Sequence, residues 1–423
     1  MLNRILSHYD KAIWIRFLGQ VISSLGNFMI TPFITLYLYN RLHVSLIDTM
    51  LVVSIAPAVS LVSGVFAGPL ADRWGRKPLL CLSLFGQAIT LALYALAHNA
   101  AQFAIITMLE GVAESFYWPA ASAQITDVVP EEKRSEVFSL LHMGLNIGAA
   151  IGPMIGAAFF TTAPRVLFII AGATTLLTAL LILRYVPETR PAKASSRQAA
   201  SSHAGLPKKL PLFLRHFHVG KGLLKDYGLV TWITILSLPI TILYAQVRTN
   251  LPLHLALHFT NYTHVFAIMM TFNGTCVILF QMVVSRLTRT SQTWFLLLIS
   301  SLAFAAVGFG YAFAPSLALL LLTEFVFTVG EMIGFPQLQH AVGLLAPPEK
   351  RGIYFAIFGL RWTIGSVAGP LIGGWFTRIA SGAWMFSIVG IAILIAGLLM
   401  VAIIRRHSST EIDLVDNQTV QNA

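Results

Sequence analysis

The sequence has few charged residues, since only 11% of its 423 residues are Asp, Glu, Lys or Arg. A soluble domain typically carries about 25%, so this chain lacks the charge to cover a surface that faces water on all sides. Disordered chains are poor in apolar residues, whereas 56% of these residues are hydrophobic. The composition therefore excludes a disordered chain and argues strongly against a soluble globular protein.

Cysteine is scarce too, and catalytic motifs are missing. Cys81 and Cys276 lie in or beside apolar segments, with no spacing typical of a metal site or a disulfide framework. The sequence has no nucleotide-binding P-loop, no recognisable pair of nucleophile and base, and no His/Cys cluster. We therefore expect neither an enzyme nor a receptor, no cofactor or metal, and no direct use of ATP.

Long apolar runs, in contrast, fill most of the chain. A helix needs about 20 apolar residues to cross a bilayer, and it satisfies its own backbone hydrogen bonds there. Twelve such runs occur, near residues 12–38, 46–70, 78–97, 101–124, 137–161, 165–186, 229–250, 264–285, 293–313, 316–340, 353–377 and 382–404. We predict an all-α integral membrane protein with twelve transmembrane helices.

The runs form two groups of six around a polar stretch. We predict an N-terminal six-helix bundle in residues 1–186, a cytoplasmic linker in 187–228 and a C-terminal six-helix bundle in 229–404. A polar cytoplasmic tail, 405–423, is expected to be disordered. The linker is basic and rich in Ala and Ser, and part of it has the pattern of a short helix on the membrane surface.

The basic residues set the expected orientation. With the N-terminus in the cytoplasm, 23 of the 28 Lys and Arg residues fall on the inner side and four on the outer side. Cytoplasmic loops carry such an excess, so both termini are expected inside, in a bacterial cytoplasmic membrane. The net charge of +11 then reflects topology and contact with the lipid bilayer rather than binding of nucleic acid.

The two halves share a sequence pattern. Each matching residue of the second half follows its counterpart in the first half by the same number of residues, the repeat offset. The sequence PEEKR at Pro130–Arg134 recurs as PPEKR at Pro347–Arg351, and the same offset maps Glu114 onto Glu331. It also maps Gly148, Gly152, Pro153 and Gly156 onto Gly365, Gly369, Pro370 and Gly373. Internal symmetry of this kind is typical of transporters, whose substrate site lies near the bilayer midplane between the repeats.

Three motifs resemble those of a known family. The loop after the second run, Gly68–Leu79, reads GPLADRWGRKPL, the fifth run contains a Gly-Pro motif at Gly148–Gly156, and Pro187–Arg190 reads PETR. These sequences are similar to motifs of the major facilitator superfamily, and among its members the chain looks most like twelve-helix bacterial drug:proton antiporters. The resemblance implies two homologous six-helix bundles that expose a central site to each side in turn.

The resemblance also implies a cytoplasmic latch that holds the halves in one conformation. Asp72 is the central residue, and in the second half the aspartate and glycines are absent from the corresponding stretch, 281–289. The latch is therefore expected on one side only, and we expect Asp127 to pair with Arg76. The latch residues are Gly68, Asp72, Arg73, Gly75, Arg76, Lys77, Asp127 and Arg134.

The Gly-Pro motif occurs in both halves. Pro153 and Pro370 each remove a backbone donor, and the surrounding glycines let another helix approach closely. The resemblance implies that this motif lies at the contact between the halves and shapes coupling. The alternative is ordinary close packing of helices. The residues concerned are Gly148, Gly152, Pro153, Gly156, Gly365, Gly369, Pro370 and Gly373.

Four carboxylates fall inside predicted spans, where a charge is costly and marks a functional site by default. They are Glu110, Glu114, Glu324 and Glu331. A low-dielectric site favours the neutral carboxyl group, so such a residue can bind a proton and release it on the other side. We favour Glu114 and Glu331, because they are equivalent in the two halves. Polar side chains satisfied between packed helices are the alternative.

Further polar residues complete the expected cavity. Arg361, in the eleventh run, requires a partner, and Glu331 or Glu324 is the natural one. The first run carries a polar stripe that includes Asn27, and Asn146 lies one turn from His142 in the fifth run. The related antiporters usually have an Arg where this chain has Thr107, so the usual proton-coupling scheme does not transfer directly.

We therefore expect a secondary transporter that exchanges protons for a small-molecule substrate and acts as a monomer. The favoured substrates are small amphipathic or cationic compounds, with aromatic residues such as Tyr244 and Trp362 as cavity walls. The alternative is a proton-coupled exporter or flippase of a sugar, lipid or metabolite. An ion channel is disfavoured by the duplication and by the motif around Asp72.

Overall fold

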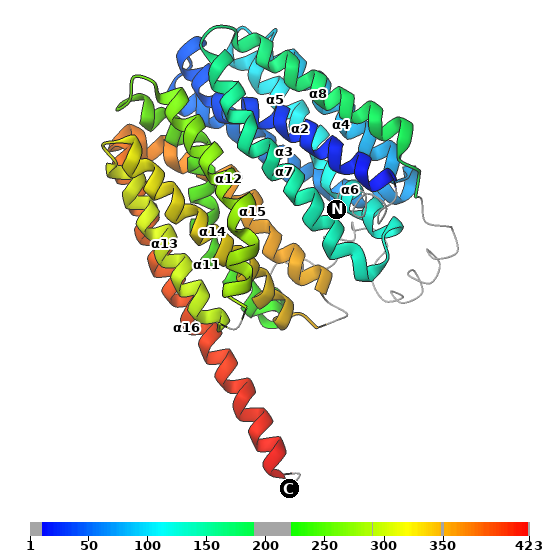
Figure 1. Ribbon diagram of the computed structural model, residues 1–423, viewed down its shortest axis with the longest axis vertical. Helices are drawn as coiled ribbons and strands as arrows, with labels where there is room; N and C mark the ends of the chain where they lie inside the picture. Colours follow the sequence, from blue (N-terminus) through cyan, green and yellow to red (C-terminus); the bar gives the residue numbers. More distant parts are fainter. Residues whose placement is uncertain (1–10, 190–220, 290, 348–350, 422–423) are drawn as a thin grey trace. The chain divides into compact units, whose positions relative to one another are not determined.

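The computed structural model describes residues 11–189, 221–289, 291–347 and 351–421, which are almost entirely helical and contain no strand. Long apolar helices follow one another with short connections (Figure 1). The helices before the gap are α2 (Lys11–Leu36), the π-helical η1 (Tyr37–Arg41), α3 (Leu46–Trp74), α4 (Arg76–Tyr94), α5 (Ala100–Ser115), α6 (Tyr117–Val128), α7 (Glu131–Phe160) and α8 (Pro164–Tyr185).

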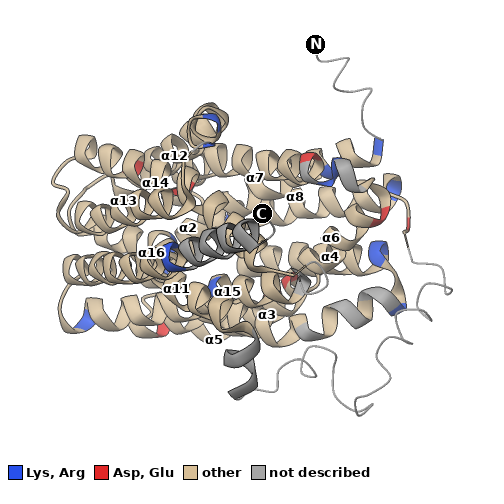
Figure 2. Cartoon of the chain, turned by 90° about the horizontal axis from the view of Figure 1, so that it is seen from below, with Lys and Arg blue, Asp and Glu red and all other residues tan. Residues whose placement is uncertain are grey.

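The helices after the gap repeat this plan. They are α11 (Lys221–Ala256), α12 (Tyr262–Leu287), α13 (Thr293–Phe313), α14 (Leu317–Leu345), α15 (Arg351–Ile379) and α16 (Gly382–Gln421). Most of the described ribbon carries neither acidic nor basic residues (Figure 2). This distribution is the one expected of helices that cross a bilayer.

Eleven described helices are long and apolar enough to cross a membrane. The predicted fourth span is the exception, because the chain breaks it at Phe116 into α5 and α6. Pro119 explains the break, since it has no N–H to bond the carbonyl of Ser115 and its ring crowds that carbonyl. Together α5 and α6 cover the position of this fourth predicted span, so the all-α membrane fold is confirmed.

The chain divides into two compact units, Met1–His218 with Leu255–Gly274, and Val219–His254 with Thr275–Ala423. The first part of α12 therefore belongs to the first unit. It is held there by the Thr271 hydroxyl, which donates to the Ala150 carbonyl at 2.7 Å. A Cβ at Gly274 would lie 2.8 Å from the Cβ of Ala150, so the two helices meet closely.

The helix contacts recur at the repeat offset found in the sequence. A Cβ at Gly148 would lie 2.5 Å from Ser24, and one at Gly365 would lie 2.7 Å from Thr241, the residue equivalent to Ser24. Ser83 donates to the Ala113 carbonyl at 2.7 Å, and its counterpart Ser300 donates to the Gly330 carbonyl at 2.8 Å. Equivalent residues thus make equivalent helix contacts in the two halves.

Two boundaries differ from the expectation. Helix α11 starts at Lys221, inside the predicted linker, and carries non-helical torsion angles at Tyr227, so the apolar span proper begins after this kink. Helix α16 continues to Gln421, so the structure contradicts the expected disordered tail. The tail contains no Gly or Pro after Arg405, and without such a residue nothing local ends the helix.

Candidate functional site

A cluster of one half-buried acid and two buried hydroxyl groups lies between α4 and α5. The Tyr94 hydroxyl donates to a carboxylate oxygen of Glu110 and lies 2.9 Å from the hydroxyl of Thr107. Tyr94 is 1% exposed, and its ring stacks on Phe103 with centroids 4.6 Å apart. The apolar packing fixes the hydroxyl in place, so Glu110 has a preformed partner inside the helix bundle.

A second acid, Glu324 in α14, is fully buried at 0% exposure. The Tyr311 hydroxyl on α13 donates to Oε2 of Glu324 at 2.6 Å. Within the described residues, Oε1 of Glu324 has no hydrogen-bond partner. A buried carboxylate with one empty oxygen is costly as an anion and favourable as a neutral acid, so this group is suited to hold a proton.

The two clusters are related by the duplication. The repeat offset makes Tyr94 and Tyr311 equivalent, and it makes Glu324 equivalent to Thr107 rather than to Glu110. The acid in the first half therefore lies one helical turn beyond the position of the acid in the second half. The tyrosine is the common element, and its hydroxyl lies within hydrogen-bond distance of the side chain at the shared position in both halves.

The acids favoured from the sequence have different surroundings. Glu114 is exposed and Glu331 is half-buried, whereas Glu110 accepts a hydrogen bond from Tyr94 and Glu324 accepts one from Tyr311. Glu331 lies within electrostatic range of Glu324 and of the Tyr244 hydroxyl, and Glu114 within range of Glu110. The four predicted acids thus form two pairs, one in each half.

An aromatic cluster surrounds Tyr244 in α11, next to Glu331. Trp362 is 37% exposed, so the cluster has an open side. Ring centroids near that of Tyr244 belong to Phe327 at 4.7 Å, Phe335 at 5.3 Å, Trp362 at 5.4 Å and Phe304 at 6.1 Å. A carboxylate beside partly open aromatic faces can bind an organic cation.

Arg361 does not have the partner expected from the sequence. Its guanidinium carbon lies 3.3 Å from the ring centroid of Phe358, and it donates to the Phe358 carbonyl at 3.3 Å. None of the acids in the described residues forms an ion pair with it at 4.0 Å or less. The aromatic ring offsets part of the burial cost in the way a carboxylate would, through the electrostatics of its face.

The remaining polar residues predicted for the cavity bond mainly to neighbours on their own helix. The Thr31 hydroxyl donates to Oδ1 of Asn27 at 2.7 Å, and the amide of Asn146 lies 3.3 Å from the ring of His142. Gln20 joins two helices, because it accepts a hydrogen bond from Tyr117 at 3.0 Å. Asn27 is exposed and Asn146 half-buried, and both remain candidates for cavity residues.

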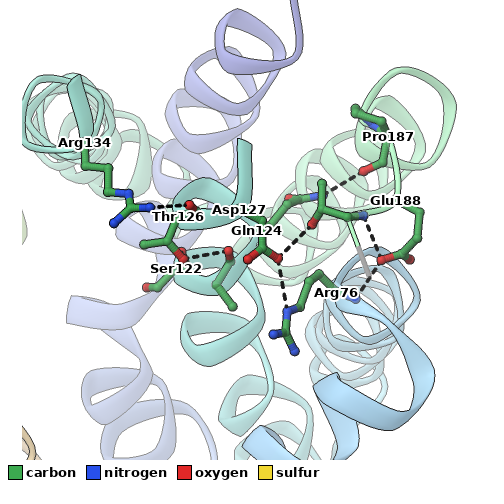
Figure 3. A network of polar contacts seen from close by, with 10 residues as sticks. Arg76, Ser122, Gln124, Thr126, Asp127, Arg134, Pro187 and Glu188 are labelled. Atoms are coloured by element: carbon green, nitrogen blue, oxygen red, sulfur yellow. Dashed lines mark hydrogen bonds and ion pairs between the residues drawn. The ribbon is translucent and has the colours of Figure 1, made fainter. Parts of the chain in front are cut away.

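The expected pair of Arg76 and Asp127 is present. Nε of Arg76 lies 3.4 Å from Oδ2 of Asp127, and the backbone N–H of Arg76 donates to Oε1 of Glu188 at 2.9 Å (Figure 3). The Thr189 hydroxyl also donates to Asp127, at 3.2 Å. This network ties the start of α4, the end of α6 and the segment after α8 together.

Other predicted latch residues have different roles or remain undescribed. Arg134 caps the end of α6 by donating to the Thr126 carbonyl at 2.8 Å and to the Val129 carbonyl at 3.1 Å (Figure 3). Arg73 is exposed and Lys77 half-buried. The surroundings of Gly68 and the side chain of Asp72 lie outside the described residues. Arg190, the last residue of the PETR motif, lies outside them as well.

Sequence reasoning missed several functional partners. The sequence motifs do not single out Tyr94 and Tyr311, although the repeat offset relates them and each lies near the end of an apolar run. Glu188 and Thr189 are included only within a motif, which does not predict their contacts with Arg76 and Asp127. Both signals were present in the sequence, as equivalence between the halves and as polar residues at the helix ends.

Two repeats of apolar helices with acids buried inside them define a secondary transporter. Comparison with known families agrees with this class. The chain belongs to the Major Facilitator Superfamily, whose family model matches residues 16–359 and 249–418. It is a multi-pass membrane transporter and not an enzyme.

Individual relatives cover nearly the whole chain. It is 30% identical to the uncharacterized MFS-type transporter YhjO of Bacillus subtilis, over 94% of both chains. It is 28% identical to a Na(+), Li(+), K(+)/H(+) antiporter of Planococcus maritimus (93% of this chain, 95% of the relative). It is 22% identical to the quinolone resistance protein NorA of Staphylococcus aureus (94% and 97%).

Solved structures show the same fold. The crystal structure of a POT family transporter in complex with 5-aminolevulinic acid matches with a TM-score of 0.76, at 14% identity, over 94% of this chain and 97% of that chain. This likeness concerns the arrangement of the helices alone.

Proposed function

We propose that the protein is a proton-coupled antiporter that exports small cationic compounds from a bacterial cell, with both termini in the cytoplasm. The observation that carries this proposal is the pair of Tyr311 and Glu324. Glu324 is fully buried, accepts one hydrogen bond at Oε2, and has no hydrogen-bond partner for Oε1 among the described residues. Such a group has no structural need to be ionised. Its chemistry is that of a site that takes up and releases one proton per cycle.

The coupling follows from the electrostatic interaction of the two acids of the second half. Glu324 and Glu331 lie within electrostatic range of one another, and two nearby carboxylates resist being ionised together. A cation that binds to ionised Glu331 neutralises its charge, so Glu324 can ionise and release its proton. When the cation leaves, the bare carboxylate of Glu331 favours a proton on Glu324 again, so proton and cation alternate without covalent chemistry.

The cargo side of this scheme rests on the aromatic cluster around Tyr244. Its ring and that of Trp362 lie 5.4 Å apart beside Glu331, and aromatic faces stabilise organic cations. The relatives support export of cations, since one is named as an alkali cation/H(+) antiporter and another as a quinolone resistance protein. Organic cations are the first choice and alkali cations the second.

The test is cargo-driven proton movement in proteoliposomes. The wild type is expected to release trapped protons when an organic cation is added, and Glu324→Gln to lose this response while it still binds the cation in a thermal-shift assay. Glu136→Gln is the matched control, because Glu136 is exposed at the start of α7. Full proton movement in Glu324→Gln contradicts the proposal. Export of a sugar or lipid without cation response favours the alternative cargo.

A further inference from the structure

The two halves differ sharply at one set of equivalent positions. In the first half Phe33 stacks on Phe160 with ring centroids 5.2 Å apart, and Tyr37 packs edge-on against Phe168 at 5.2 Å. Phe33 is 2% exposed and Tyr37 4%. Aromatic side chains therefore occupy this part of the first half, where they line a small apolar cavity with Ile30, Pro164 and Leu167.

In the second half the same positions are polar. The repeat offset places Asn250, His254 and Thr377 where the first half has Phe33, Tyr37 and Phe160. The helix crossing confirms the equivalence, because a Cβ at Gly156 would clash with Phe33 and one at the equivalent Gly373 would clash with Asn250. Since the fold accepts aromatic residues here, packing alone does not explain the polar ones.

Hydrogen bonds satisfy part of this polar set. The Asn250 amide donates to Oε1 of Gln246 and lies 3.2 Å from the Thr249 hydroxyl, and Gln246 donates to the Gly369 carbonyl at 2.6 Å. In the described part of the chain, Oδ1 of Asn250 and Oγ1 of Thr377 are buried without a partner. Buried polar atoms of this kind are usually satisfied by ordered water.

The polar set lies close to the buried acid. The His254 ring is 5.6 Å from the ring of Phe386, and the Phe386 ring is 5.7 Å from that of Tyr311, which donates to Glu324. One aromatic side chain therefore stands between His254 and the tyrosine that holds the acid. The polar set and the buried acid therefore lie on either side of one ring, and water beside that ring would be needed to join them.

We propose that Gln246, Asn250, His254 and Thr377 hold water molecules that carry protons between the C-terminal end of α11 and Glu324. The inference rests on the proposed proton coupling. A proton arriving at one ring nitrogen of His254 releases the proton from the other. Tyr311 then passes its hydroxyl proton to Glu324 and regains one from the water side. The net change is one proton on Glu324, with every carrier restored.

The test removes the two unpartnered oxygens with side chains of similar shape; because Asn250→Leu also removes the amide that donates to Gln246, Thr377→Val alone is measured beside the double variant. Asn250→Leu/Thr377→Val is expected to slow cargo-driven proton movement about tenfold in proteoliposomes with a trapped pH dye, while the affinity for the cargo cation stays unchanged. Thr377→Ser is expected to keep the wild-type rate. Phe33→Leu is the matched control, because it alters the equivalent apolar position in the first half.

Each outcome decides the question. A wild-type rate in the double variant overturns the route, and so does an equal loss of cargo affinity and proton movement, which indicates a structural role. Slowing seen only in the presence of Na(+) identifies a bound cation in place of water and also overturns it. If the double variant does not fold, Thr377→Val alone carries the test. Absence of proton movement in the wild type contradicts the proposed function itself.

Discussion

The hydroxyl of Tyr311 donates to Oε2 of Glu324 at 2.6 Å, and the equivalent hydroxyl of Tyr94 lies 2.9 Å from Thr107. The duplication has therefore kept the tyrosine in both halves, while the side chain it bonds has become an acid in one half and a hydroxyl in the other. Glu110, one turn further along α5, supplies the acid that Thr107 does not. Each half thus has an acid that accepts from a tyrosine, half-buried in the first half and fully buried in the second, at positions one turn apart.

Tyr311→Phe is expected to slow cargo-driven proton movement. The hydroxyl donates to Oε2 of Glu324, and a bond to a charged group contributes about 1.5–3 kcal/mol. Without it the ionised form of Glu324 loses this stabilisation, so proton release is expected to be about tenfold slower. The measurement is the rate of cargo-driven proton movement in proteoliposomes.

Tyr185→Phe is the control for that experiment, because Tyr185 is exposed at the end of α8. It is expected to leave the rate unchanged. A wild-type rate in Tyr311→Phe, with the protein folded, shows that Glu324 is not the group whose proton is released.

The sequence was sufficient to predict the fold, because each element depends on local composition. Apolar runs predict spanning helices, and the repeat offset predicts equivalent packing, which Gly148 and Gly365 confirm. The break at Phe116 was missed, although Pro119 carries its cause. Pro336, the equivalent residue, lies inside the unbroken α14, so proline alone does not decide between a bend and a break.

The site was less predictable, because its contacts join residues far apart in the sequence. The pair of Arg76 and Asp127 was found from a motif, but the position of Arg361 over Phe358 was not. A basic residue inside an apolar run suggests an acidic partner. A phenylalanine partner cannot be recognised in the same way, because the chain has 28 phenylalanines and nothing in the sequence distinguishes Phe358 from the others.

Gly365→Ala is expected to destabilise the second half. The new methyl group would lie 2.5 Å from Oγ1 of Thr241 and 3.0 Å from the backbone of the same residue, so the helices must separate. Overpacking of this kind costs about 1–3 kcal/mol, and the Thr241 hydrogen bond to the Arg361 carbonyl, at 2.9 Å, is strained as well. The measurement is the melting temperature of the purified protein in detergent.

Gly359→Ala is the matched control on the same helix. A Cβ at Gly359 meets nothing within 4 Å, and alanine is favoured over glycine in a helix by about 1 kcal/mol. This variant is expected to melt at the wild-type temperature or slightly above it. Equal melting temperatures for both variants contradict the close contact of α11 and α15.

Gly75→Ala is expected to destabilise the network around Arg76. Gly75 has φ of +106°, a conformation that alanine adopts only with strain, and a Cβ there would lie 2.7 Å from a carboxylate oxygen of Glu188. The backbone strain alone costs about 1–3 kcal/mol. Glu188→Ala in the same chain removes the clash and not the strain, so the double variant is expected to recover part of the melting temperature. Complete recovery shows that the backbone is not strained.

Trp362→Leu is expected to separate the two classes of cargo. The partly exposed indole of Trp362 lies 5.4 Å from the ring of Tyr244, beside Glu331, and a cation–aromatic contact contributes about 0.5–2 kcal/mol. The variant is expected to bind an organic cation several-fold more weakly, because an aliphatic side chain lacks the negative electrostatic potential of an aromatic face. Binding of Na(+) or K(+) through Glu331 is expected to stay unchanged.

The measurement is the affinity of each cation for the wild type and the variant, and Trp384→Leu is the control, since Trp384 is exposed on α16. Equal weakening for organic and alkali cations indicates that Trp362 supports the shape of the site, and unchanged affinity for both removes it from the cargo site.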